Sequence, residues 1–240
     1  MHILLDIDGT IGTRNTRRFL ELCNKRLKLN MDPERVNQLR YSEFFTQPEV
    51  LACKERLGEE KFTLALEWTR LDPRHLLAII PMPGALTGAA KLTAFGELAY
   101  YTARKTPGSG ELQHRINTQL ERATLRWLRK QNFPNPEAAI FCEGPEEKLL
   151  HIADLIKQTA QPVLLVDDMW KLLLAAAADL DTATYQLLKQ SLTLCAFGAH
   201  EVPEQCDIQT IALYRWSEVT SLISLLDKEE ITHGRHRQRT

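Results

Sequence analysis

Short apolar runs alternate with helix-period segments along the chain after residue 84. Strands that alternate with helices of about ten to fifteen residues indicate βαβ units and a parallel sheet. We therefore predict an α/β fold with a Rossmann-like parallel sheet. The predicted strands are residues 97–101, 138–142, 162–166, 192–197 and 210–213, and the predicted helices are residues 85–94, 110–129, 146–159, 172–189 and 217–226.

The N-terminal residues 2–7 predict one more strand, because they are short and aliphatic like a buried parallel strand. This strand runs into the sequence LLDIDGT. Side chains two apart on a strand point the same way, so Asp6 and Asp8 are expected to face one spot at the strand's carboxyl end, where α/β sheets bind ligands. Gly9 permits a tight turn, and Thr10 offers a hydroxyl and an amide. Two like charges at one spot need a cation or a shared proton to relieve their repulsion. The plainer interpretation is a solvated turn that contains two aspartates.

Residues 14–74 carry helical patterns and almost no strand-like alternation. Asp32, followed by Pro and Glu, is typical of a helix start, and residues 48–68 predict a longer helical region. The Pro and Gly residues at 81–84 break the pattern. The predicted domains are a sheet domain of residues 1–12 and 82–230, an inserted helical domain of residues 13–81, and a basic tail of residues 231–240.

The composition restricts partners and compartment. The formal net charge of −1 over 240 residues gives no bulk attraction to nucleic acid or to an anionic membrane. The most apolar segment, residues 172–180, is too short to span a bilayer, and a strand beginning at residue 2 leaves no room for a signal peptide. The 5 cysteines are scattered without C-x-x-C spacing, which favours a reducing cytoplasm and argues against zinc. The basic tail is either a frayed terminus or a contact for phosphate or nucleic acid.

A threonine and an arginine follow the predicted strand of residues 97–101. Thr102 is expected at the same sheet edge as Asp6. A threonine at a strand end is common, so its position relative to Asp6 is what favours a functional role. Arg104 has two interpretations, a contact with a substrate anion or an ion pair with an acid.

Lys148 lies in the first turn of the helix predicted over residues 146–159. A fixed cation there would offset the charge of the acids expected at the same edge of the sheet. A surface ion pair with the neighbouring glutamates is the alternative. Lys105 and Lys130 are possible substitutes.

Two adjacent carboxylates, Asp167 and Asp168, end the apolar run VLLVDD. Capping of the next helix explains one of them but hardly both. Several carboxylates within a few ångströms repel one another by several kcal/mol at a protein-like dielectric. A hard divalent cation such as Mg²⁺ removes that penalty, because it takes carboxylate oxygens as ligands.

Taken in order, these four segments resemble the four motifs of the haloacid dehalogenase-like (HAD) phosphohydrolase superfamily. The resemblance implies a HAD-type core with an inserted α-helical cap of the C1 type. It implies a cytoplasmic, Mg²⁺-dependent phosphatase that hydrolyses a small phosphorylated metabolite, such as a sugar phosphate or a nucleotide, through an aspartyl-phosphate. The implied catalytic roles are Asp6 as nucleophile and Asp8 as general acid and base. The implied metal ligands are Asp6, Asp8 (through its carbonyl), Asp167 and Asp168. The implied phosphate contacts are Thr102, Ala103, Lys148 and, in one interpretation, Arg104.

The chain departs from the family pattern after its fourth motif. Many relatives carry another acid three or four residues later, whereas MWKL follows Asp168 here. Which of Asp167 and Asp168 contacts the metal first is therefore open, and Asp167 is favoured. The family's dehalogenases lack an acid at the position of Asp8, which disfavours dehalogenation. Two further hypotheses are a phosphotransferase or phosphomutase of the same superfamily and a HAD-like domain that binds without turnover.

The helical insertion is also expected to choose the substrate. A mobile lid would control the access of water to the phosphoenzyme. One of its arginines is a candidate anion contact, and the four candidates are Arg14, Arg17, Arg18 and Arg40.

Overall fold

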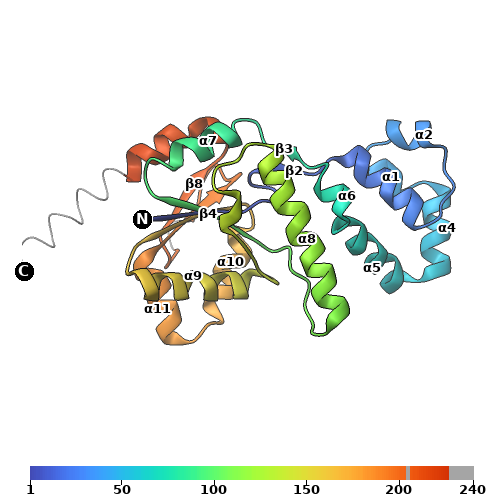
Figure 1. Cartoon of the computed structure of the whole chain (residues 1–240). Helices are drawn as coiled ribbons and strands as arrows, with labels where there is room; N and C mark the ends of the chain where they lie inside the picture. The colour runs from blue at the N-terminus through green and yellow to red at the C-terminus, as the bar shows by residue number, and fades with distance from the viewer. Residues whose placement is uncertain (204–205, 227–240) are drawn as a thin grey trace, which may run out of the picture. The chain divides into compact units, whose positions relative to one another are not determined.

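The computed structural model describes residues 1–203 and 206–226 (Figure 1). Internal contacts divide the chain into a sheet unit, formed by residues 1–12, 81–105 and the chain from 128 onward, and a helical unit, formed by residues 13–80 and 106–127. The predicted tail of residues 231–240 lies outside the described residues.

The sheet unit is built on six strands that all run parallel. Their order is β5-β4-β1-β6-β7-β8, so β1 lies in the interior of the sheet. The predicted α/β class with a Rossmann-like parallel sheet is confirmed. The strands are β1 (His2–Leu5), β4 (Glu97–Thr102), β5 (Ala139–Phe141), β6 (Val163–Asp167), β7 (Leu192–Phe197) and β8 (Thr210–Leu213).

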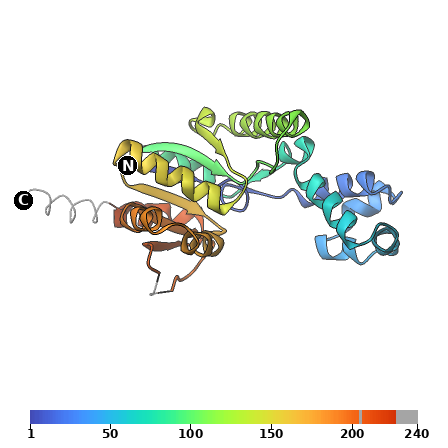
Figure 2. The ribbon, with the colours of Figure 1, turned by 90° about the horizontal axis from the view of Figure 1, so that it is seen from below.

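Helices cover both faces of this sheet (Figures 1 and 2). On one face lie α9 (Pro145–Thr159), α10 (Trp170–Ala178) and α11 (Thr182–Ser191), and on the other lie α7 (Ala85–Leu92) and the helical residues 219–226. Burial on both faces explains why the strands are continuous apolar runs rather than alternating ones. One core cluster joins side chains from β1, β6 and β7 to the three helices of the first face, among them Leu4, Leu165, Leu194, Ile152, Leu173 and Leu188.

The prediction of one helix over residues 172–189 is wrong. The structure has two helices there, because α10 ends at Ala178 and α11 begins at Thr182. Asp181 lies between them as the N-cap of α11, and its side chain accepts the backbone N–H of Thr184 at 3.0 Å. An aspartate that bonds the backbone in this way favours a new helix start over the continuation of the old helix.

The helical unit contains α1 (Thr16–Arg26), α2 (Pro33–Gln38), α3 (Tyr41–Phe45), α4 (Pro48–Leu57), α5 (Glu59–Arg70) and α6 (Pro73–Leu76), and it also takes in most of α8 (Glu111–Lys130). Its core gathers buried side chains that include Phe19, Leu20, Cys23, Phe44 and Phe62.

Two local features of the helical unit follow from its sequence. The predicted helix start at Asp32 is confirmed, since its side chain accepts the N–H of Glu34 at 3.2 Å. The predicted helical region of residues 48–68 is divided between α4 and α5 by Gly58, whose φ of +77° favours glycine.

The contact-based units differ from the predicted domain limits over residues 106–127. The sequence placed this segment with the sheet, whereas its contacts group it with the helices. One such contact is the indole N–H of Trp127, which donates to the carbonyl of Ile79 at 2.9 Å. Two short strands, β2 (Gly12–Thr13) and β3 (Ile80–Pro81), pair where the chain passes between the units. Over the described residues, no helix is both long and apolar enough to cross a membrane.

Candidate functional site

The sheet topology brings three strand ends together. β1 lies between β4 and β6, and Leu5 pairs with Tyr100 on one side and with Val166 on the other. Asp6 directly follows β1, and its N–H donates to the carbonyl of Val166 at 2.9 Å. Asp167 is the last residue of β6. The two acids are therefore neighbours at the carboxyl edge of the sheet, where α/β folds bind ligands.

Lys148 joins these two acids from α9. This helix begins at Pro145, directly after β5 and its short connecting turn, so Lys148 lies in its first turn. The ammonium Nζ lies 2.8 Å from Oδ1 of Asp6 and 2.7 Å from Oδ2 of Asp167. All three side chains are buried, with exposures of 5% for Lys148, 7% for Asp6 and 1% for Asp167. The neighbouring glutamates do not take Lys148 as a surface partner, and Glu147 instead accepts from Lys105 at 2.7 Å.

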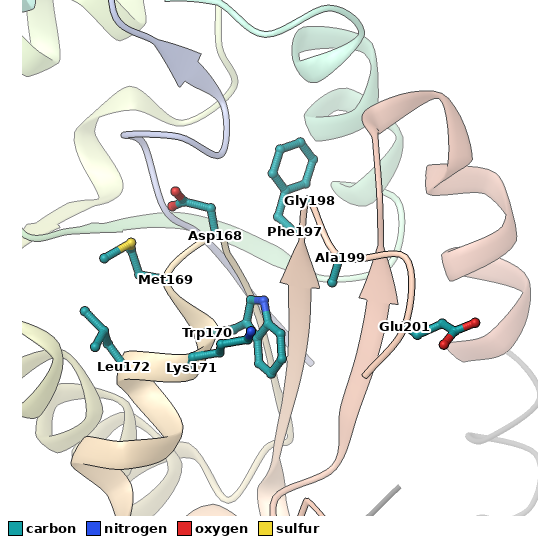
Figure 3. Close-up of a pocket in the computed structure, with 9 residues that line it drawn as sticks. All are labelled: Asp168, Met169, Trp170, Lys171, Leu172, Phe197, Gly198, Ala199 and Glu201. Atoms are coloured by element: carbon teal, nitrogen blue, oxygen red, sulfur yellow. The ribbon is translucent and has the colours of Figure 1, made fainter. Parts of the chain in front are cut away.

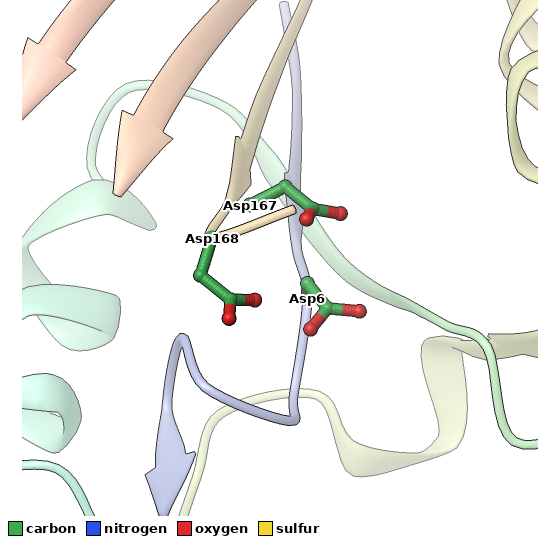
Figure 4. Close-up of side chains that lie close together, drawn as sticks. All are labelled: Asp6, Asp167 and Asp168. Atoms are coloured by element: carbon green, nitrogen blue, oxygen red, sulfur yellow. The ribbon is translucent and has the colours of Figure 1, made fainter. Parts of the chain in front are cut away.

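A third carboxylate, Asp168, belongs to the same cluster. Its backbone N–H donates to Oγ1 of Thr10 at 3.0 Å, and that hydroxyl lies 3.3 Å from Oδ1 of Asp168. Gly9 makes this approach possible, because its φ is +84° and a Cβ there would lie 2.1 Å from the Asp168 carboxylate. One oxygen from each of Asp6, Asp167 and Asp168 lies within 4.8 Å of the others (Figure 4).

The cluster carries more negative than positive charge. Burial raises the pKa of Asp6 to about 8, the charges of Asp167 and Asp8 add to the shift, and Lys148 opposes it. Burial likewise raises the pKa of Asp168 to about 6. Burial acts to lower the pKa of Lys148, but its two carboxylate partners raise it above its ordinary value. The cluster thus has one ammonium for three carboxyl groups, and a further cation is needed to keep all three ionised together. The donors are all carboxylate oxygens, which are the ligands that Mg²⁺ takes.

Thr102 is the last residue of β4, next to β1. Its side chain is fully buried, and among the residues that the structure describes its hydroxyl Oγ1 has no hydrogen-bond partner. A buried hydroxyl without a partner costs about 1–3 kcal/mol. A ligand oxygen at this edge of the sheet would remove that cost. Ala103 follows as an exposed residue outside the strand.

Asp8 has a different partner from Asp6. Two nitrogens of Arg104, Nε and Nη2, lie 2.7 Å from its two carboxylate oxygens. Because β1 ends at Leu5, the strand alternation that placed Asp6 and Asp8 at one spot does not extend to Asp8. The Asp6 side chain is buried against Lys148, whereas the Asp8 carboxylate is 56% exposed. The structure shows Arg104 in an ion pair with an acid, and its contact with a substrate anion stays a prediction.

Sequence reasoning missed Trp216. Its indole Nε1 donates to the carbonyl of Thr10 at 2.8 Å, across 206 positions of sequence. The ring is buried and lies so close to Gly88 that a Cβ there would be 2.3 Å from it. Trp216 therefore supports the turn that holds Asp168. No pattern in the sequence connects these positions, whereas the threonine of the DGT sequence was visible as a polar residue at a strand end.

A cavity of about 460 Å³ adjoins the acidic cluster at Asp168 (Figure 3). The segments that follow β6 and β7 line it, and most of its side chains are apolar. They include Met169, Trp170, Leu172, Phe197 and Ala199, and Lys171 and Glu201 add charge.

The four candidate arginines of the helical unit already have partners within that unit. The guanidinium of Arg14 lies 4.9 Å from the ring of Phe19 and 5.0 Å from that of Tyr41. Arg17 and Arg18 pair with Glu21, and Arg40 pairs with Glu43. Their expected contact with a substrate anion stays a prediction.

No protein-family model and no curated protein matches this sequence, but solved structures match its fold. A haloacid dehalogenase-like family hydrolase from Streptococcus pneumoniae aligns over 92% of this chain and 97% of its own, with a TM-score of 0.52 and 13% identity. A haloacid dehalogenase-like family hydrolase from Xanthomonas campestris aligns over 95% and 96%, with a TM-score of 0.47 and 12% identity. The 2-haloacid dehalogenase from Pseudomonas syringae aligns over 94% and 98%, with a TM-score of 0.44 and 13% identity.

The first of these alignments covers almost the whole of both chains and agrees with the six-stranded parallel sheet found here. The protein is thus an α/β protein with a Rossmann-like core. More specifically, it has the haloacid dehalogenase-like fold, which its four motifs predicted.

Proposed function

We propose that this protein is a Mg²⁺-dependent phosphatase that hydrolyses a small phosphate monoester through an aspartyl-phosphate. The observation that carries the proposal is the buried ammonium of Lys148 between Asp6 and Asp167, with Asp168 beside them. A cation that holds a buried carboxylate in place beside an excess of negative charge suits a nucleophile that must meet a phosphate dianion. The free state of all 5 cysteines supports a cytoplasmic location.

The reaction needs two displacements at phosphorus. A carboxylate oxygen of Asp6 attacks phosphorus, the bond from phosphorus to the leaving oxygen breaks, and Asp8 gives that oxygen a proton. Asp8 then takes a proton from water as the water oxygen attacks the aspartyl-phosphate. The bond from phosphorus to Asp6 breaks, which releases inorganic phosphate and restores both acids.

The remaining residues balance charge and hold the phosphoryl group. Lys148 offsets the charge of Asp6, and the buried hydroxyl of Thr102 is suited to donate to a phosphoryl oxygen, with the backbone N–H of Ala103 as a second donor. The carboxylates of Asp6, Asp167 and Asp168 would hold the metal, and the family pattern adds the carbonyl of Asp8. Bound Mg²⁺ would supply positive charge that lowers the cost of bringing phosphate to these acids.

The test is phosphate release from a panel of sugar phosphates, nucleotides and aryl phosphates, with and without Mg²⁺. We expect release by the wild type and a loss of about a thousandfold or more in Asp6→Asn. Asp154→Asn is a matched control, because Asp154 is an exposed acid on α9 that pairs with Lys157. Equal release by the wild type and Asp6→Asn refutes the mechanism. Release of less phosphate than ester consumed indicates transfer to a second substrate instead.

A further inference from the structure

The ion pair between Arg104 and Asp8 is unequal in burial. The Arg104 side chain is 1% exposed, whereas the carboxylate that it holds is 56% exposed. Withdrawing a guanidinium from water is costly unless its N–H groups are satisfied in good geometry. Two contacts of 2.7 Å from Nε and Nη2 provide that geometry. The arginine is thus anchored in the protein, while the acid at its tip faces the exterior.

A two-point contact of this kind fixes orientation as well as position. The planar fork of arginine matches the plane of a carboxylate, so the pair resists rotation of the acid about its side-chain bonds. Each carboxylate oxygen carries two lone pairs. The guanidinium takes one lone pair on each oxygen of Asp8, and more than half of this side chain stays exposed to the exterior. The same carboxylate in a contact with one lysine nitrogen would be free to turn.

The position of Arg104 in the fold relates the orientation of Asp8 to that of Asp6. Arg104 lies two residues beyond Thr102, at the end of the strand next to β1, so it is anchored to the same sheet edge as Asp6. The clamp therefore sets Asp8 relative to the group that attacks phosphorus. A solvated acid on the turn after β1 would not be held in a fixed position relative to Asp6.

We propose that Arg104 is the positioning residue for Asp8, and that it acts on the proton transfer to the leaving group rather than on phosphate binding. The proposal rests on the proposed phosphatase function and adds a role to it. The competing interpretation is that Arg104 binds the phosphoryl group directly. The two differ in what they predict for esters that share the phosphoryl group but differ in the leaving group.

The test compares 4-nitrophenyl phosphate with 4-methylphenyl phosphate, which are similar in size. Nitrophenolate leaves readily without a proton, whereas methylphenolate depends on one. In Arg104→Met we expect kcat to fall by about 30- to 100-fold for the methylphenyl ester and by less than about threefold for the nitrophenyl ester, because general acids contribute about a hundredfold or more. KM should change little for either ester. Arg104→Lys keeps the charge without the fork and should recover only part of the loss.

Two controls separate this effect from loss of structure. Arg129 makes a similar two-point contact with Glu137, at 2.6 Å from each nitrogen, on the exposed end of α8. Arg129→Met should leave both esters unaffected. Added to Asp8→Asn, Arg104→Met should cost little more on the methylphenyl ester, because residues that act as a unit are not additive. Melting temperatures confirm that each variant is folded.

The outcomes are distinct. A common rise in KM for both esters assigns Arg104 to the phosphoryl group and overturns the proposal. An equal loss of kcat on both esters, or no change on either, also overturns it. Phosphate release by the wild type that does not depend on Asp6 overturns the proposed function itself, and that result is recognised before Arg104 is changed.

Discussion

Asp6 in the sheet unit and Asp72 in the helical unit are the same residue type at almost the same burial, with exposures of 5% and 6%. Their pKa values nevertheless shift in opposite directions. Burial raises the pKa of Asp6 to about 8. Burial acts in the same sense on Asp72, but hydrogen bonds from Arg74 and Arg26 overcome it and lower its pKa to about 2.

The sites of Asp72 and Asp6 differ in the number of cations available to each acid. Asp72 accepts from two arginines, Arg74 at 2.7 Å and Arg26 at 3.0 Å, and its other oxygen accepts the backbone N–H of Arg74 at the start of α6. At the sheet edge one lysine serves two buried acids, with a third acid beside them. The first arrangement is a satisfied structural ion pair. The second has an excess of negative charge, which is a property of sites that bind cations.

The largest expected effect comes from removing Lys148, the cation between Asp6 and Asp167. Lys148→Met leaves Asp6 and Asp167 buried without it, and breaking a buried ion pair costs about 3–5 kcal/mol. We expect that loss in the free energy of unfolding, measured with urea, together with loss of phosphate release. Lys157→Met is the matched control on the same helix, because Lys157 is 56% exposed and pairs with the exposed Asp154. It should cost less than about 0.5 kcal/mol. Equal effects of the two substitutions would contradict the assigned role.

The second largest expected effect is the stabilisation of the folded protein by added Mg²⁺. Mg²⁺ at about a hundred times its dissociation constant should stabilise a folded-state site by about 2.7 kcal/mol. For a unit of this size that is a rise in melting temperature of about 5–10 °C. EDTA should reverse the rise, and Asp167→Asn should abolish it. Asp72→Asn should retain it, because Asp72 already has its cations. An equal rise in Asp167→Asn would place the bound metal elsewhere.

Asp72 should in turn govern stability in acid. Its folded-state pKa of about 2 lies below its ordinary value of 3.8, so its contribution is complete above about pH 4 and is lost as the pH falls toward 2. We expect Asp72→Asn to cost about 1–2 kcal/mol at pH 7, allowing for solvent screening. The difference from the wild type should shrink as the pH approaches 2. Thermal unfolding of both proteins from pH 7 to pH 2 measures it, and a difference independent of pH would contradict the ion pair.

The sequence predicted the features that depend on local order. The strands, the helix start at Asp32 and the placement of Asp6, Thr102 and Asp167 at one edge follow from periodicity and from the parallel pairing of neighbouring strands. Each of these needs only a few consecutive residues and one topological rule.

The features that were not predicted depend on contacts between distant residues or on a local break. Asp8 lies beyond the end of β1, so its orientation comes from Arg104, 96 residues away, rather than from the strand. The separate helices around Asp181 arose because an N-cap bond outweighed a continuous apolar pattern. The gathering of acids at the sheet edge was predicted from the aspartates at the strand ends, but the size of their pKa shifts depends on burial, which only the fold sets.

The smallest expected effect concerns how the acids of the two sites are held. Asp72 is held by the start of its own helix, whereas Asp168 is held through Thr10 by Trp216, a brace that is distant in sequence. The indole of Trp216 donates to the Thr10 carbonyl at 2.8 Å, and the Thr10 hydroxyl contacts Asp168. Trp216→Phe keeps an aromatic ring but removes the donor, which should cost about 1 kcal/mol. The Mg²⁺ concentration at half-maximal stabilisation should rise a few fold, because the turn that orients Asp168 is loosened. Trp127→Phe, which removes a similar indole bond to the Ile79 carbonyl in the helical unit, should lower stability comparably without changing the response to Mg²⁺. An unchanged Mg²⁺ response in both variants would show that the brace serves stability alone.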